Sequence, residues 1–228
     1  MQKRHTAIAI DGPAAAGKST VAKIVAEKLG YLYVDTGAMY RALTWKVLEK
    51  GLDPSEEDAV LHVLLETDIE LKNDHSGQRV IVDGKDVTEE IRYQPVSANV
   101  SYIAKLPKIR MEMLKRQQQL AENRNVVMDG RDIGTHVLPD AEVKIFLVAS
   151  VDERAKRRHK ENLEKGIPSD LETLKKEIEK RDGIDSNRKI APLTKAADAI
   201  EVDTTSLTIE EVVKKILQEV EKLTNKQK

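Results

Sequence analysis

A glycine-bounded loop near the amino terminus restricts the folds open to this 228-residue chain. Residues 7–10 form a short apolar run, and apolar residues recur at helical spacing from Gly17 to Leu29. Between these segments, residues 12–19 read Gly-Pro-Ala-Ala-Ala-Gly-Lys-Ser. A strand, a glycine loop and a helix in direct succession predict an α/β domain that is built on a parallel sheet.

The loop matches the pattern G-x-x-x-x-G-K-S, which is typical of phosphate binding. Its small residues let successive backbone N–H groups point at a polyphosphate, and the dipole of the following helix adds to that field. Lys18 would lie along the outer phosphates, and the Ser19 hydroxyl would be a direct ligand of Mg²⁺. We therefore expect ATP or GTP to bind here with Mg²⁺. The expected contacts are Gly12, Pro13, Ala14, Ala15, Ala16, Gly17, Lys18, Ser19 and Thr20.

Composition excludes several other classes of protein. The 38 basic residues against 39 acidic ones give a net charge of -1, so nucleic acid is not the expected partner. With no cysteine, the chain cannot form disulfides, thiolate nucleophiles or cysteine-ligated metal sites. Apolar runs such as residues 143–149 are far shorter than the roughly 18 residues of a membrane span, and Asp11 interrupts the first run before it could act in export. We expect a cytoplasmic monomer without a membrane partner.

Strands and helices continue to alternate after the loop, which favours a parallel sheet. Residues 68–92 break the rhythm, because their short β-type runs and tight turns favour a small antiparallel insertion. Charged helices are expected from Val151 and again up to Arg181, with a break at residues 166–168. The five strands expected in the parallel sheet cover residues 7–10, 31–34, 126–128, 143–148 and 199–202.

Polar residues follow two of these strands at the point where each one ends. Asp35 to Arg41 come after the second strand, and Asp129 to Asp132 come after the third. Ligands of an open parallel sheet bind at this edge, and an arginine fork can hold a phosphate with two hydrogen bonds. A third cluster, Arg181, Asp185 and Arg188, would share one face of a helix. By itself that cluster favours a surface ladder of ion pairs, because the region is rich in charge.

Five motifs together resemble the bacterial cytidylate kinase family over nearly the whole chain. They read A-I-D-G-P-A-A-A-G-K-S-T, D-T-G-A-M-Y-R, D-G-R-D-I-G-T, R-D-x-x-D-x-x-R and A-P-L-x-x-A-x-D-A. The resemblance implies transfer of the γ-phosphoryl group of ATP to CMP or dCMP, giving ADP and the nucleoside diphosphate. It implies a P-loop fold of three layers, with a core of residues 1–40 and 108–228 and a short helical lid at about 151–168. Residues 41–107 would be the monophosphate-binding domain.

The resemblance also implies roles for individual residues. Thr36, Arg41 and Arg131 would hold the acceptor phosphate, whereas Ser101, Arg110 and Asp132 would read the cytosine edge. Arg181 and Asp185 would hold the sugar hydroxyls, with Arg188 nearby. Arg154, Arg157 and Arg158 are candidates to close over the ATP phosphates, and Asp129 would orient magnesium-bound water. The catalytic residues would be Lys18, Asp129, Arg131 and Arg158. His136 stands where an apolar residue is expected in the family.

Other functions on the same core remain open at this point. A kinase for UMP and CMP, or for another small molecule, would need the same phosphate loop. An ATP-binding regulatory module would also need it, but would show no acceptor-dependent turnover. A guanine-nucleotide switch is disfavoured, because the chain has no N-K-x-D motif.

Overall fold

The computed structural model describes residues 5–74, 77–164 and 166–226, and its centre is a five-stranded parallel sheet in the order β2-β6-β1-β7-β8. Each strand coincides with an expected one to within two residues at either end. The α/β fold class and the five-stranded parallel core are thereby confirmed. The strands are β1 (Ala7–Asp11), β2 (Leu32–Asp35), β6 (Val126–Gly130), β7 (Val143–Val148) and β8 (Ile200–Asp203).

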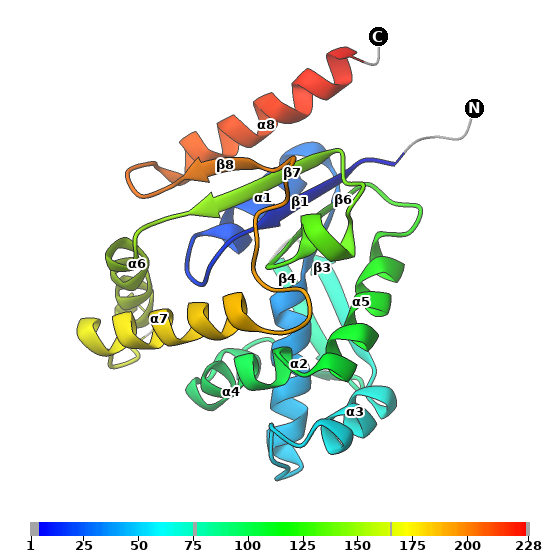
Figure 1. Ribbon diagram of the computed structural model, residues 1–228, viewed down its shortest axis with the longest axis vertical. Coiled ribbons are helices and arrows are strands. Elements are labelled where there is room, and N and C mark those ends of the chain that lie inside the picture. Colours follow the sequence, from blue (N-terminus) through cyan, green and yellow to red (C-terminus); the bar gives the residue numbers. More distant parts are fainter. Residues whose placement is uncertain (1–4, 75–76, 165, 227–228) are drawn as a thin grey trace.

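Helices cover both faces of this sheet and make three layers (Figure 1). Side chains alternate across a strand, so Ile8 and Ile10 of β1 face α1 (Lys18–Leu29) and α8 (Ile209–Lys226). Ala9, between them, faces the layer that contains α5 (Pro107–Ala121) and the short π-helical turn Ile133–Val137. The sheet is therefore buried on both sides, as its continuous apolar strands require.

A second packed region extends from the edge of the sheet. It contains α2 (Thr36–Glu49), α3 (Glu57–Glu66), α4 (Gln94–Ala104) and a three-stranded antiparallel sheet. That sheet consists of β3 (Ile69–Asp74), β4 (Gly77–Val82) and β5 (Lys85–Asp86), followed by the 3-10 turn Glu90–Arg92. The expected antiparallel insertion at residues 68–92 is confirmed, and the turn between its first two strands includes residues outside the described part of the chain.

Helix α3 is absent from the sequence expectations. Its signal is weak because every position from 59 to 65 except His62 is apolar, so these residues mark no single helix face. Val60, Val63 and Leu64 are the ones buried against the apolar side chains of α2 and α5. The hairpin of β3 and β4 is fastened to the edge of the parallel sheet by Gln78. Its amide donates to the Tyr33 carbonyl at 2.8 Å and accepts from Asp35 N at 3.3 Å.

Helices α6 (Val151–Glu164) and α7 (Leu171–Asn187) form a pair beside the carboxyl end of the sheet (Figure 1). Helix α7 continues past Arg181, where the sequence pattern placed its end, to Asn187. Asp185 lies in this extension and is buried, so the added turn carries a charged group into the interior. No helix in the described part of the chain has the length and apolar character to cross a bilayer.

Candidate active site

The phosphate loop is closely packed against the sheet, and this explains its first glycine. Gly12 has a φ of 148°, and a Cβ at this position would lie 2.2 Å from the Leu147 carbonyl oxygen. Only glycine fits that approach. Gly17 also has a positive φ, of 86°, and forms the N-cap of α1. The strand, loop and helix context that the motif requires is therefore present.

Lys18 extends back over this loop, and its Nζ donates to the Pro13 carbonyl at 2.7 Å. The side chain is buried, and burial together with the neighbouring Arg131 lowers its pKa. A cation held in this way without a full counter-charge is a strong site for an anionic ligand. Phosphate oxygens in the loop would supply that counter-charge.

Ser19 and Asp129 meet where the loop faces the end of β6. The Ser19 hydroxyl donates to Asp129 Oδ2 at 2.9 Å, and the Tyr33 hydroxyl donates to Asp129 Oδ1 at 2.9 Å. Burial and the nearby Asp35 raise the pKa of the Asp129 carboxyl. Within the described residues, no group of three or more acidic or imidazole side chains could hold a metal ion. The two oxygen donors suit Mg²⁺, which keeps most of its sites for phosphates and water.

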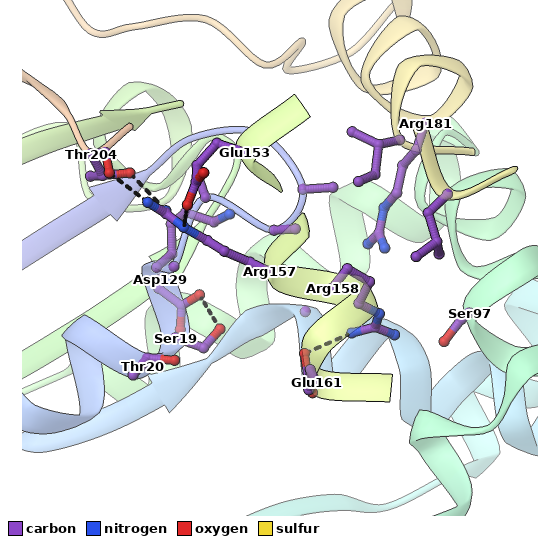
Figure 2. Close-up of a pocket in the computed structure, with 18 of the residues that line it drawn as sticks. Ser19, Thr20, Ser97, Asp129, Glu153, Arg157, Arg158, Glu161, Arg181 and Thr204 are labelled. Atoms are coloured by element: carbon purple, nitrogen blue, oxygen red, sulfur yellow. Dashed lines mark hydrogen bonds and ion pairs between the residues drawn. The ribbon is translucent and has the colours of Figure 1, made fainter. Parts of the chain in front are cut away.

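A cavity of about 1050 Å³ opens over the phosphate loop and extends toward α4 (Figure 2). Arg158 enters it from α6 and Arg181 from α7. Arg181 forms no ion pair with any described residue, and its Nε has no hydrogen-bond partner. Burial and the neighbouring Arg131 lower the pKa of Arg181 to about 10. The expected site residues outside the loop that line this cavity are Arg41, Ser101, Asp129, Arg131, Arg157, Arg158 and Arg181.

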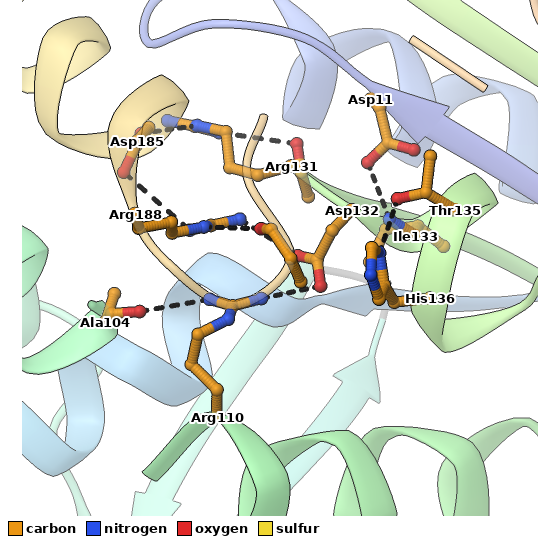
Figure 3. A network of polar contacts seen from close by, with 12 residues as sticks. Asp11, Ala104, Arg110, Arg131, Asp132, Ile133, Thr135, His136, Asp185 and Arg188 are labelled. Carbon is orange, nitrogen blue, oxygen red and sulfur yellow. Dashed lines mark hydrogen bonds and ion pairs between the residues drawn. The ribbon is translucent and has the colours of Figure 1, made fainter. Parts of the chain in front are cut away.

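A buried network of arginines and carboxylates adjoins this cavity through Arg131 (Figure 3). Asp132 accepts from Arg110 at 2.5 Å and from Arg188 at 3.3 Å. Asp185 accepts from Arg131 Nε at 2.9 Å, and it also forms an ion pair with Arg188 at 3.8 Å. Arg188 lies just past the end of α7 in extended backbone, so the expected shared helix face is wrong for it. Asp185 and Arg188 are both buried, which excludes the surface ladder for them.

A family model described as cytidylate kinase matches residues 8–222 of this chain. The chain belongs to the cytidylate kinase family. It is 66% identical over 220 residues to a cytidylate kinase of Oceanobacillus iheyensis, covering 96% of this chain and 95% of that protein. It is 60% identical over 219 residues to one of Bacillus subtilis, with coverages of 96% and 98%. The resemblance of the motifs is therefore confirmed.

One solved structure shares the fold of this chain. An uncharacterized protein from Eubacterium ventriosum superposes with a TM-score of 0.53 at 13% identity, covering 96% of this chain and 99% of that one. At that identity the match shows a shared fold alone. The substrate site of this cytidylate kinase family member must be argued from its own residues.

Three of the expected residues are already bonded to other groups of the protein in this family member. The Thr36 hydroxyl donates to the Asp129 carbonyl at 2.7 Å, on the backbone of β6. Arg157 donates to the carbonyl of Thr204 at 2.5 Å and to its hydroxyl at 3.1 Å. Arg154 is bonded to the backbone of the phosphate loop and to Asp182. Of the three lid arginines, Arg158 has the weakest restraint, a 3.4 Å ion pair with Glu161.

Sequence analysis left some cavity residues without a role. Residues 204–208 line the cavity directly after β8, and Ser97 lines it from α4. The rule that ligands bind at the carboxyl ends of strands applies equally to β8 and would have found the first group. Ser97 lies on a helix with no distinctive motif, so the sequence holds no signal for it.

Asp11 is a buried carboxyl that ties the end of β1 to the turn after Asp132. It accepts from the backbone N–H groups of Ile133 at 2.9 Å and Gly134 at 2.8 Å, just beyond Asp132 (Figure 3). Burial raises the pKa of Asp11 to about 6, although these hydrogen bonds and Lys18 oppose the rise. The folded chain thus binds this proton more tightly than the unfolded chain does.

This shift predicts a pH-dependent difference in stability between the wild type and Asp11→Asn. The stability contributed by protonated Asp11 is complete below the unfolded pKa of 3.8 and is lost as pH rises through about 6. We expect the unfolding free energy of the wild type, relative to the variant, to fall by about 2 kcal/mol from pH 4 to pH 7. Urea unfolding at stepped pH measures this difference. A difference that does not change with pH would contradict the assignment.

Proposed function

We propose that this protein transfers the γ-phosphoryl group of ATP to CMP or dCMP, yielding ADP and the corresponding nucleoside diphosphate. The observation that carries the proposal is the meeting of two sites at one edge of the sheet. The phosphate loop with Lys18 lies on one side, and the buried arginine–carboxylate network around Asp132 lies on the other. Arg131 borders the same cavity as Lys18 and lies close enough to lower its pKa.

Each side of the cavity has a separate task in this proposal. Lys18 and Arg158 stabilise charge on the transferring group, and Arg41 and Arg131 hold the acceptor phosphate in line. Residues 1–40 and 108–228 act as the core and 41–107 as the monophosphate-binding domain, with a lid at about 151–168. Transfer to water would waste ATP, so the lid and this domain would close over the bound nucleotides.

Ser19 and Asp129 would hold Mg²⁺ together with the phosphates of ATP. Their contact at 2.9 Å places a hydroxyl and a carboxylate oxygen together at the start of α1. When bound there, Mg²⁺ would neutralise charge on the phosphate oxygens. The protein holds the Asp129 carboxylate in a fixed orientation, because Ser19 donates to its Oδ2 and Tyr33 donates to its Oδ1.

The reaction needs little proton transfer from the protein. The attacking oxygen belongs to a phosphate that is already largely ionised near neutral pH, so no strong general base is required. Positioning and charge neutralisation supply the catalysis, which suits a site rich in arginine. Unpaired Arg181 faces the cavity and adds a further positive charge for an anionic substrate.

Base selection would depend on the buried network. Asp132 can accept a hydrogen bond from the exocyclic amino group of cytosine, while Arg110 and Ser101 can donate to its acceptors. In the absence of substrate, Asp132 is satisfied by Arg110 and Arg188. Uracil has a carbonyl oxygen in place of the amino group, and an acceptor that faces the Asp132 carboxylate is unfavourable, so UMP should be a poor substrate.

Release of ADP from Mg-ATP with a single acceptor at a time tests the proposal. We expect fast turnover with CMP and dCMP, and little with UMP, AMP or shikimate. Turnover with another acceptor would retain the phosphate loop and reject the cytosine assignment. ATP binding without turnover on any acceptor would instead favour a regulatory module.

A further inference from the structure

The tip of the phosphate loop is held from outside the cavity by one ion pair. Asp182 of α7 accepts from the Ala14 backbone N–H at 3.3 Å through one carboxylate oxygen. Its other oxygen accepts from Arg154 NH1 at 2.6 Å, and the same NH1 donates to the Ala14 carbonyl at 3.0 Å. Both polar groups of Ala14 are therefore bound by this pair, which we call the Ala14 clamp (Asp182 and Arg154).

The Arg154 guanidinium uses its hydrogen bonds within the protein. Its Nε donates to the Ala149 carbonyl at 3.0 Å, and the residue is only 4% exposed. It is absent from the described residues that line the cavity, although its neighbours Arg157 and Arg158 are among them. To reach a nucleotide phosphate, Arg154 would have to give up a buried ion pair and two backbone hydrogen bonds.

The loop has a local reason to need such support. Ala15, directly after Ala14, has a φ of 59°, in the left-handed region where a residue with a Cβ is strained. The Ala15 side chain packs on an apolar cluster formed by Ala155 of α6 with Leu174 and Ile178 of α7. The Ala14 clamp and this cluster together hold the strained turn in place.

Helix α7 also reaches the acceptor side of the site. Arg181, next to Asp182, faces the cavity, and Asp185, one turn later, binds Arg131 at 2.9 Å. One helix thus contacts the phosphate loop through Asp182 and the acceptor arginine through Asp185. A rigid helix with both contacts fixes the donor and acceptor sites relative to each other.

We propose that Asp182 and Arg154 are positioning residues that hold the phosphate loop in its nucleotide-binding shape and contact neither nucleotide. The inference deepens the proposed function, on which it rests for the identity of the two substrates. It assigns Arg154 a role different from the lid contact with ATP that the resemblance implies. The resemblance assigns no role to Asp182, but here Asp182 and Arg154 contribute equally to ATP binding.

The two roles for Arg154 predict opposite results for Asp182→Asn. Asparagine keeps an oxygen for the Ala14 N–H but loses the charge that holds Arg154. If Arg154 contacts ATP, its release should leave binding unchanged or improve it. If the pair positions the loop, we expect Mg-ADP to bind about tenfold or more weakly, as loss of a charged hydrogen bond implies. Calorimetric titration with Mg-ADP alone measures this and requires no acceptor.

Arg154→Lys provides a second variant that keeps the charge but lacks the planar fork. A simple charge contact with phosphate would survive this change, whereas a group bonded to three fixed acceptors would not. We expect Arg154→Lys to weaken Mg-ADP as much as Asp182→Asn does. The double variant should lose little more than either single one, because the pair acts as a unit. Glu179→Gln, an exposed charge loss on the same helix, is the matched control.

Steady-state kinetics distinguish positioning from a general loss of structure. Positioning raises KM for ATP and leaves KM for CMP unchanged, whereas partial unfolding lowers the active fraction and changes neither KM. Thermal unfolding without nucleotide checks the folded fraction of each variant. Wild-type Mg-ADP affinity in Asp182→Asn, or in Arg154→Lys, would overturn the inference. Failure of CMP turnover with the binding loss still present would overturn the proposed function alone.

Discussion

Replacing Lys18 with alanine is expected to lower turnover about a thousandfold, as removal of a preorganised charge donor does in other enzymes. Lys18 Nζ rests on the Pro13 carbonyl and has Arg131 and Arg181 as positive neighbours. The negative charge of bound phosphates would make the position of the Lys18 ammonium favourable. The lysine would therefore stabilise the transition state most, when the transferring group gains charge. Measurement of kcat with saturating Mg-ATP and CMP tests the expectation.

The same substitution should leave the fold intact. Burial and Arg131 lower the pKa of Lys18, which means that its charge is unfavourable in the folded chain without ligand. We therefore expect a Tm equal to or above that of the wild type, together with the loss of activity. Lys28→Ala, an exposed change on the same helix, controls for loss of a lysine from α1. Near-normal turnover in Lys18→Ala would contradict the phosphate-binding assignment.

Asp132→Asn is expected to lower kcat/KM for CMP about 10- to 100-fold, the worth of a charged hydrogen bond in a buried site. The side chain accepts from two arginines and is one-tenth exposed. An asparagine keeps the shape but replaces one acceptor oxygen with a donor, which would face the amino group of cytosine. Selectivity between CMP and UMP should fall in parallel, and kinetics with both acceptors measure it.

Stability must be measured beside this selectivity, because Asp132 neutralises two buried guanidinium groups. Without the negative charge that they share, the positive charges of both guanidinium groups are no longer neutralised. Breaking a buried ion pair typically costs about 3–5 kcal/mol of stability. We expect lower stability in Asp132→Asn, so its kinetics need a temperature at which the variant remains folded. Asp140→Asn, an exposed carboxylate in the same connection, is the control. Equal loss of kcat/KM for every acceptor would argue against base recognition by Asp132.

The elements that sequence analysis predicted correctly are those with strong local patterns. Residues 143–148 are apolar apart from Lys144 and predict a strand buried on both faces, and β7 is such a strand. The phosphate loop is likewise recognisable from its own residues, because its backbone needs glycine where Gly12 approaches the Leu147 carbonyl. Helix α3 was missed because its apolar residues fill nearly all of positions 59–65 and mark no single face, and its burial depends on α2 and α5.

The sequence by itself determined the sheet, the phosphate loop and the strand ends at which polar residues gather, because each follows from neighbours in the chain. Only the tertiary structure decided the partners of those residues. Arg110 and Asp132 are 22 residues apart, Arg131 and Asp185 are 54 apart, and Arg154 reaches Ala14 across 140 residues. No local pattern encodes such pairs, since an arginine on a charged helix has the same sequence signal whether it is solvated or buried. Packing against distant segments buries these charged side chains and pairs them, as the network of Asp132 and Asp185 and the Ala14 clamp.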